Sequence, residues 1–254
     1  MLAKERENQI VSMIQESGAV TTSKLVSFFG VSIETIRKDL LSLENQGKLA
    51  RVHGGAVLKG DMKPYLDLKE RNKEFSEEKR ALSIKACEFI NEGDIISIDC
   101  GSTAIIFAQV IKEKFNSLTV VTNSAEVFQI LKDCKNFKLI LCGGYYSPSE
   151  SSFCGGFTLD MLNNIHVQKG FIFPRAISFK YGLCDYDKDV SQIQKKLIEI
   201  SDEVFILADS SKYEKQALLK IDDMKKEYFY ITDSSLNAET QKLYLENDLK
   251  IFLG

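Results

Sequence analysis

Five short apolar runs between residues 95 and 233 constrain the fold of this chain more than any other feature. Each run is rich in Ile, Val, Leu, Phe or Tyr, and stretches with helical periodicity separate the runs. The runs lie at 95–99, 118–122, 138–142, 203–209 and 227–233. Strands that alternate with helices form parallel sheets, so this pattern predicts an α/β domain. Ligands bind at the carboxyl ends of such strands, where we expect one crevice.

Small, hydroxyl, acidic and basic residues follow these strands. They are Asp99, Gly101, Ser102, Thr103, Thr122, Asn123, Ser124, Gly143, Gly144, Asp209 and Lys212. The run Gly101–Thr103 stands between a strand and a helix, where backbone N–H groups and hydroxyls can hold an anion such as phosphate. Lys212 would add a positive charge to the same anion. Each motif is common when taken alone, so the prediction of a site for a small phosphorylated metabolite depends on their convergence.

A helix is predicted to open this α/β domain. Ser76 can cap it, and Leu82, Ile84 and Ala86 are its candidates for burial. The preceding segment is charged and shows no clean period. We therefore expect a linker at 59–75 and a domain at 76–254 that senses an effector and mediates oligomerisation.

Three short helices are predicted in residues 1–58. Residues 2–15 carry apolar side chains on one helical face and charged side chains on the other. Thr21 can cap a second helix that ends at Gly30, and Ser32 can cap a third.

The third helix extends to Gly47 and is followed by a run that predicts a β-hairpin, or wing. The apolar residues of the helix that we expect to face the core are Ile33, Ile36, Leu40 and Leu43. In the run 48–58 apolar positions alternate about Gly54 and Gly55, as is typical of a hairpin. Residues 1–58 therefore have the element order of a winged helix-turn-helix.

The N-terminal half of the third helix is polar and basic, as a helix in the major groove of double-stranded DNA requires. The residues expected to contact DNA are Ser32, Thr35, Arg37 and Lys38 on this helix and Arg51 and His53 on the wing. Net charge neither supports nor excludes DNA binding. Residues 1–58 hold seven basic and six acidic side chains, and the whole chain carries a formal charge of −3. By charge alone, a small helical domain with a solvated face would be the simpler interpretation.

Residues 31–57, VSIETIRKDLLSLENQGKLARVHGGAV, closely resemble the helix-turn-helix and wing signature of the DeoR family of bacterial regulators. The motifs IDCGST, VVTNS, LCGG, YGL and LADSSK resemble the sensor domain of that family, which is related in fold to ribose-5-phosphate isomerase. The resemblance implies a repressor of a sugar or carbohydrate operon, with operator DNA and a phosphorylated effector as partners. Lys38 stands where the family more often has arginine, which favours a phosphate contact over bidentate base recognition.

Two segments depart from the family pattern. Where the family usually has FIGADGI, this chain has FIFPRAI, so that Phe173 and Ala176 replace glycines and Arg175 replaces an acid. A frequent basic position has become Gln194. Arginine binds phosphate and carboxylate bidentately, so Arg175 favours a more anionic ligand. Alternatively, Arg175 pairs with an acid such as Asp185 or Asp187 and closes the site.

Two further functions compete with regulation by a ligand. A sugar-phosphate isomerase needs a carboxylate base in the crevice, and the FPRA segment lacks one where it is expected. A constitutive DNA-binding protein would use its second domain only for oligomerisation. We therefore expect a regulator and not an enzyme, without a cofactor, that acts as a homo-oligomer.

The six cysteines are scattered without a CxxC pair and the chain has two histidines, so we expect free thiols in or near the core and no metal site. The start of the chain is charged, and no apolar run is long enough to span a bilayer. These features predict a cytoplasmic protein without a membrane partner.

Overall fold

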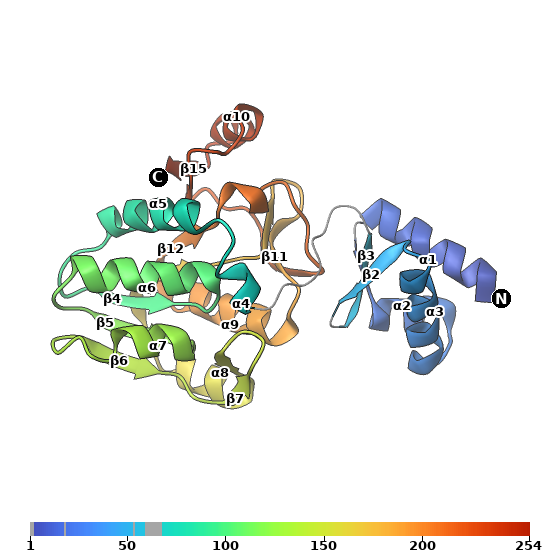
Figure 1. Ribbon diagram of the computed structural model, residues 1–254, viewed down its shortest axis with the longest axis horizontal. Helices are drawn as coiled ribbons and strands as arrows, with labels where there is room; N and C mark the ends of the chain where they lie inside the picture. Colours follow the sequence, from blue (N-terminus) through green and yellow to red (C-terminus); the bar gives the residue numbers. More distant parts are fainter. Residues whose placement is uncertain (1–2, 18, 53, 59–67) are drawn as a thin grey trace.

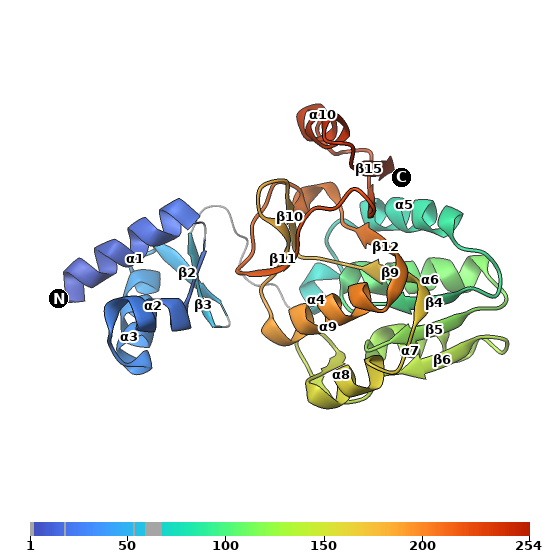
Figure 2. The ribbon, with the colours of Figure 1, turned by 180° about the vertical axis from the view of Figure 1, so that it is seen from behind.

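The computed structural model describes residues 3–17, 19–52, 54–58 and 68–254 (Figure 1). The predictions for His53 and for 59–67 therefore lie outside the described residues. A small N-terminal module and a larger α/β domain form two separate bodies in both ribbon views (Figure 2).

Three helices and three strands make up the N-terminal module. They are α1 (Ala3–Ser17), β1 (Ala19–Thr21), α2 (Thr22–Phe29), α3 (Ile33–Asn45), β2 (Leu49–Val52) and β3 (Gly55–Leu58). Strand β3 pairs antiparallel with both β2 and β1, so the sheet order is β1-β3-β2. The predicted hairpin is confirmed, and β1, which was not predicted, extends it.

Side-chain caps set the starts of α2 and α3. The hydroxyl of Thr21 accepts a hydrogen bond from the N–H of Lys24, and the hydroxyl of Ser32 accepts one from the N–H of Thr35. Gly30 ends α2 with a φ of 64°, a left-handed conformation that glycine adopts without strain. Both predicted caps are confirmed.

The core of the module confirms the apolar face of α3 except at its first residue. Ile36, Leu40 and Leu43 are buried together, but Ile33 is 46% exposed. Ile33 has the right helical period, but it is the first residue of α3, and a period alone does not show how far along a helix the core extends. The prediction that Ile33 faces the core is wrong.

Seven parallel strands form the central sheet of the larger domain, in the order β15-β14-β12-β9-β4-β5-β6. They are β4 (Ile95–Ile98), β5 (Thr119–Thr122), β6 (Lys138–Leu141), β9 (Val167–Ile172), β12 (Ser201–Leu207), β14 (Phe229–Thr232) and β15 (Lys250–Leu253). All five predicted strands are confirmed, with ends displaced by at most two residues. Strands β9 and β15 were not predicted, although β9 occupies the centre of the sheet.

Helices cover both faces of this sheet (Figures 1 and 2). One face carries α5 (Ser76–Ala86), α6 (Ser102–Lys114) and α7 (Ala125–Leu131), and the other carries α8 (Gly156–Leu162), α9 (Lys188–Glu199) and α10 (Ala238–Glu246). Side chains alternate between two cores because successive residues of a strand point to opposite faces. Phe171 and Phe205 lie in the first core, whereas their neighbours Ile172 and Ile206 lie in the second.

Helix α5 corrects two predictions. Phe75, with a φ of 53°, holds the position before the helix, so Ser76 is its first residue and not its cap. Ile84 is 38% exposed and was wrongly expected to be buried. The residues of α5 that face the core are Lys79, Leu82, Ser83 and Ala86. Their spacing of three, four and seven residues defines one helical face, and Ile84 lies off it.

Short elements follow the carboxyl ends of the central strands. The hairpin of β7 (Tyr145–Ser147) and β8 (Ser152–Cys154) follows β6, and β10 (Ala176–Ser178) follows β9. Strand β10 pairs with β11 (Gly182–Asp185), which pairs with β13 (Leu219–Asp222). Three short helical turns complete the domain: α4 (Leu68–Arg71), η1 (Cys87–Phe89) and η2 (Ser210–Lys212). These additions bring loops over the carboxyl edge of the sheet.

Candidate functional site

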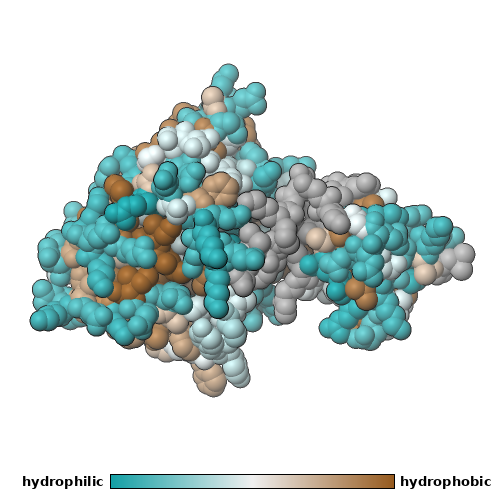
Figure 3. Space-filling view, viewed as in Figure 1, coloured by the Kyte–Doolittle hydropathy of each residue, from teal (hydrophilic) through white to brown (hydrophobic). Residues whose placement is uncertain are grey.

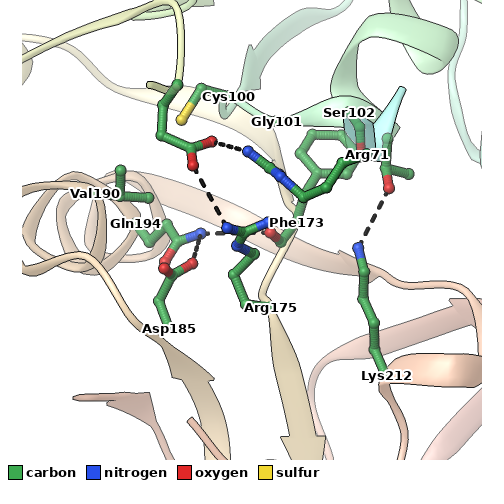
Figure 4. Close-up of a pocket in the computed structure, with 12 residues that line it drawn as sticks. Arg71, Cys100, Gly101, Ser102, Phe173, Arg175, Asp185, Val190, Gln194 and Lys212 are labelled. Atoms are coloured by element: carbon green, nitrogen blue, oxygen red, sulfur yellow. Dashed lines mark hydrogen bonds and ion pairs between the residues drawn. The ribbon is translucent and has the colours of Figure 1, made fainter. Parts of the chain in front are cut away.

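A small pocket lies at the carboxyl ends of β4, β9 and β12 (Figure 4). Five residues that were predicted to bind an effector line it: Gly101, Ser102, Thr103, Arg175 and Lys212. Three charged residues in its lining were not predicted as site residues. They are Arg71 from α4, Glu150 from the β7–β8 hairpin and Asp185 from β11.

Residues 101–103 form one wall of the pocket at the N-terminus of α6. Gly101 precedes the helix with a φ of 121°, which only glycine adopts readily. Lys212 approaches from the end of β12, with its Nζ 3.4 Å from the Thr103 hydroxyl and 3.6 Å from a carboxylate oxygen of Asp209. Burial lowers the pKa of Lys212, and the carboxylate of Asp209 opposes this shift. A helix N-terminus beside a half-buried lysine is an arrangement that favours an anion.

Glu150 joins the two arginines of the pocket. One of its carboxylate oxygens lies 2.5 Å from a guanidinium nitrogen of Arg71, and the other lies 3.6 Å from a guanidinium nitrogen of Arg175. Figure 4 shows that the two arginine side chains reach the same part of the pocket from different elements. Arg175 therefore has an acidic partner, as one alternative expected, and its ion pair is with Glu150, which was not among the expected candidates. Of those candidates, Asp185 lines the same pocket and feels the charge of Arg175, whereas Asp187 caps α9.

Gln194 lies between two buried carboxyl groups. Its side-chain N–H₂ group donates to Asp99 at 2.8 Å and to Asp185 at 3.4 Å. Burial raises the pKa of Asp99 to about 7 and that of Asp185 to about 6, and the charge of Arg175 opposes the shift at Asp185. The amide of Gln194 thus donates to one oxygen of each acid without the charge that a basic residue would bring, while the other carboxyl oxygen of Asp99 is buried without a partner.

The other predicted effector residues do not line this pocket. Thr122, Asn123 and Ser124 are buried at the end of β5, where Asn123 donates to the carbonyl of Phe153 and Ser124 caps α7. The two glycines Gly143 and Gly144 follow β6, and a Cβ added at Gly144 would lie 2.2 Å from the hydroxyl of Thr158. The structure therefore gathers the loops after β4, β9 and β12 around one pocket, and places the turns after β5 and β6 beside it.

Helix α3 presents its basic residues to solvent. Arg37 and Lys38 are exposed, and Arg37 forms an ion pair of 2.7 Å with Glu34, whose side chain is also exposed. The hydroxyls of Ser32 and Thr35 lie 2.9 Å apart at the start of the helix. Figure 3 shows a mostly hydrophilic surface on the visible side of this module. The first turns of α3 thus place hydroxyls and cations on one accessible end of the helix.

Arg51 has a structural partner within the module. Its side chain lies 2.7 Å from a carboxylate oxygen of Glu44, and its backbone N–H donates to the same carboxylate at 2.9 Å. This contact joins β2 to α3, and the guanidinium of Arg51 remains partly exposed.

A buried ion pair fixes α3 against α1. The guanidinium of Arg6 contacts both carboxylate oxygens of Asp39, at 2.5 and 3.0 Å, and both side chains are less than 10% exposed. The hydrogen bond to Asp39 raises the pKa of Arg6. Asp39 is part of the motif that resembles the DeoR signature, and its role here is to position α3 and not to contact solvent.

All six cysteines are free and only Cys134 is not buried, as predicted. Among the residues that the structure describes, no cluster of three His, Cys, Asp or Glu side chains could hold a metal ion. No helix in the described part of the chain is long and apolar enough to cross a membrane.

The two bodies define a class of protein: a winged helix-turn-helix module joined to an α/β domain with a charged pocket at the carboxyl edge of its sheet. Residues 6–60 match the family model of the DeoR-like helix-turn-helix domain, and residues 74–234 match that of the DeoR C terminal sensor domain. The chain belongs to the DeoR family of transcriptional regulators.

Curated relatives match along nearly the whole chain. An uncharacterized HTH-type transcriptional regulator of Bacillus subtilis, YulB, is 31% identical and covers 99% of this chain and 96% of its own length. The lactose phosphotransferase system repressor of Lactococcus lactis is 32% identical, with 85% of each protein covered. The glycerol-3-phosphate regulon repressor of Escherichia coli is 28% identical, with all of each protein covered.

Among solved structures, ribose 5-phosphate isomerase A of Methanocaldococcus jannaschii matches with a TM-score of 0.41 and 16% identity, covering 55% of this chain and 56% of that one. The family and the named relatives are regulators of transcription and not enzymes.

Proposed function

We propose that this protein is a repressor of a carbohydrate operon, which binds operator DNA as a homo-oligomer through α3 and the wing and changes its affinity when a phosphorylated metabolite occupies the pocket. The observation that carries the proposal is that exposed Arg37 and Lys38 on the N-terminal half of α3 occur in one chain with a pocket that has a helix N-terminus and Lys212 on its walls. The names of the relatives from Lactococcus lactis and Escherichia coli support repression and a link to sugar or glycerol phosphates.

Six residues are proposed to contact DNA: Ser32, Thr35, Arg37, Lys38, Arg51 and His53. Arg37 and Lys38 are exposed on α3, whose N-terminal end a helix-turn-helix directs toward the bases. Arg51 would contact the DNA backbone from the wing, with Glu44 as its partner in the free protein.

The proposed effector site has a lining and a surrounding layer. Gly101, Ser102, Thr103, Arg175 and Lys212 would contact the ligand, while Asp99 and Asp209 hold Gln194 and Lys212 in place. The remaining proposed residues, at the ends of β5 and β6, are Thr122, Asn123, Ser124, Gly143 and Gly144. Their contacts with the β7–β8 hairpin and α8 support a role in holding the loop that carries Glu150.

The lack of a carboxylate in the FPRA segment does not by itself exclude an isomerase, because Glu150 and Asp185 line the pocket. Glu150 is held by two arginines and Asp185 accepts from Gln194, so neither is placed as an exposed base. Membership in a family of regulators favours binding over catalysis.

Selection of duplexes from a random pool with the purified full-length chain, followed by footprinting with and without sugar phosphates, tests the proposal. A protected site that changes with a sugar phosphate supports it. Protection that no metabolite alters would indicate a constitutive DNA-binding protein, and turnover of a sugar phosphate would indicate an enzyme.

Replacing Lys38 by alanine is expected to weaken binding to all duplexes alike. Lysine acts as a point charge on phosphate, and loss of one phosphate contact lowers the slope of log affinity against log salt by about one. Titrations at several salt concentrations against a selected and a scrambled duplex measure this slope. A loss confined to the selected duplex would contradict a phosphate contact.

Replacing Lys212 or Ser102 separately by alanine is expected to leave DNA binding intact and to weaken the response to ligand. A hydrogen bond to a charged group contributes about 1.5–3 kcal/mol, so Lys212→Ala should show the larger loss. Isothermal calorimetry with the sugar phosphate that most stabilises the wild type measures the affinity. Unchanged affinity in both variants would place the ligand elsewhere.

A further inference from the structure

Among the described residues that line the pocket, Arg71 is the one that comes from the segment between the two domains. It ends α4, the first described element after residues 59–67, and thus belongs to the segment 59–75 that we expect to connect the two domains. Its side chain nevertheless lines the proposed effector pocket. One side chain therefore joins the connecting segment to the site.

The guanidinium of Arg71 is held inside the pocket. It contacts Glu150 at 2.5 Å, and the two side chains are only 12% and 5% exposed. It also lies against the start of α6, because a Cβ added at Gly101 would be 3.9 Å from a guanidinium nitrogen of Arg71. Arg71 is thus beside the N–H groups that would receive an anion (Figure 4).

The backbone after Arg71 is fastened to the same domain by a second contact. The buried Nζ of Lys79 donates to the carbonyl of Arg71 at 2.7 Å and to the carbonyl of Glu74 at 2.5 Å. Burial lowers the pKa of Lys79 to about 8. Leu68, at the start of α4, is 6% exposed. The contacts that fasten the end of the connecting segment to the sensor domain therefore include an ion pair, a buried lysine and an apolar side chain.

The pocket has little room while these contacts persist. Its free volume is about 10 Å³, close to the least that holds one water molecule. A phosphorylated metabolite therefore requires side chains to move. Glu150 accepts a hydrogen bond from Arg71 and forms an ion pair with Arg175. A phosphate can replace a carboxylate in such contacts and can bind a guanidinium bidentately.

We propose that Arg71 is a ligand-binding residue supplied by the connecting segment, which exchanges Glu150 for the anionic group of the ligand and thereby transmits occupancy of the pocket to the DNA-binding module. This inference rests on the function proposed above. Arg175 shares Glu150 and a similar burial, but it lies between β9 and β10 within the sensor domain. Exchange at Arg175 changes ligand affinity, whereas exchange at Arg71 also moves the connecting segment.

Hydrogen exchange of the full-length chain without ligand tests the contact itself. In Arg71→Ala, exchange in residues 68–75 should accelerate by about tenfold or more, because a charge-assisted contact is lost. Arg175→Ala is the matched control, since it removes the other guanidinium on Glu150 and should leave exchange in 68–75 as in the wild type. Unchanged exchange in Arg71→Ala would overturn the proposal whatever the ligand.

A second arm measures transmission with inorganic phosphate and a panel of sugar phosphates as probes. At saturating probe, Arg175→Ala should still change its affinity for a selected duplex, and Arg71→Ala should not. A wild-type response that persists in Arg71→Ala would overturn the proposal. If the wild type itself fails to respond to any probe, the proposed function fails, and the exchange experiment still decides whether Arg71 fastens the connecting segment.

Discussion

Replacing Asp39 by alanine is expected to lower the free energy of unfolding of the N-terminal module by about 3–5 kcal/mol. The substitution leaves the guanidinium of Arg6 buried between α1 and α3 without its carboxylate. An uncompensated buried charge costs more than the ion pair contributes, because the guanidinium has lost its water and cannot regain it. Of the substitutions proposed for this module, Asp39→Ala is expected to lower the free energy of unfolding the most.

Denaturant titration followed by hydrogen exchange in residues 3–52 measures this loss in the full-length chain. Glu34→Ala is the matched control, because it breaks an exposed ion pair. The side chain of Arg37 in that pair is 61% exposed and that of Glu34 is 67% exposed. An exposed pair contributes at most about 1 kcal/mol. A loss of that size in Asp39→Ala would mean that Arg6 finds water or another acceptor.

Replacing Arg37 by alanine is expected to weaken binding to the operator and to relax its specificity at one base pair. Arginine binds guanine bidentately in the major groove, and a lost base contact costs about 1–3 kcal/mol, or roughly 5–150-fold in affinity. Arg37 is exposed and pairs only with exposed Glu34 among the contacts described above, so its removal should leave the fold unchanged.

Competition between a selected duplex and variants of it at each base pair measures the effect. Arg37→Ala should lose discrimination at one position and keep its affinity for unrelated DNA within a few-fold. Glu34→Ala should bind at least as well as the wild type, because it releases Arg37. If Arg37→Ala and the wild type show the same preference at every base pair, the placement of α3 in the major groove is contradicted.

Local patterns in the sequence predicted much of the fold. The caps at Thr21 and Ser32 involve residues three apart, and the five predicted strands are apolar runs. Strand β9 was missed because its sequence, VQKGFI, is interrupted by polar residues. Its Lys169 is buried beside Asp94, a partner that no local pattern reveals.

The pocket likewise has a part that local sequence predicts and a part that depends on the fold. The cradle of residues 101–103 was predicted because it lies at one strand-to-helix junction, and family resemblance supplied its function. Arg71 and Glu150 are 79 residues apart and Gln194 and Asp99 are 95 apart, so only the fold brings them together. Glu150 was not expected as the ion-pair partner of Arg175 because it lies on the β7–β8 hairpin, which only the fold brings to the pocket. Of the two acids that the sequence suggested, Asp185 lines the pocket and Asp187 caps α9.

The central claim is that a phosphorylated metabolite controls sequence-specific DNA binding by this chain. Fluorescence anisotropy of a selected duplex, titrated with the full-length protein at fixed salt with and without sugar phosphate at the lowest concentration that saturates the wild type, tests it most directly. We expect one or more sugar phosphates to change the affinity of the wild type by about 5–150-fold, the usual range of such coupling, and to have much less effect on Lys212→Ala. An affinity for the selected duplex that no phosphorylated metabolite changes, or that equals the affinity for scrambled DNA, would contradict the account.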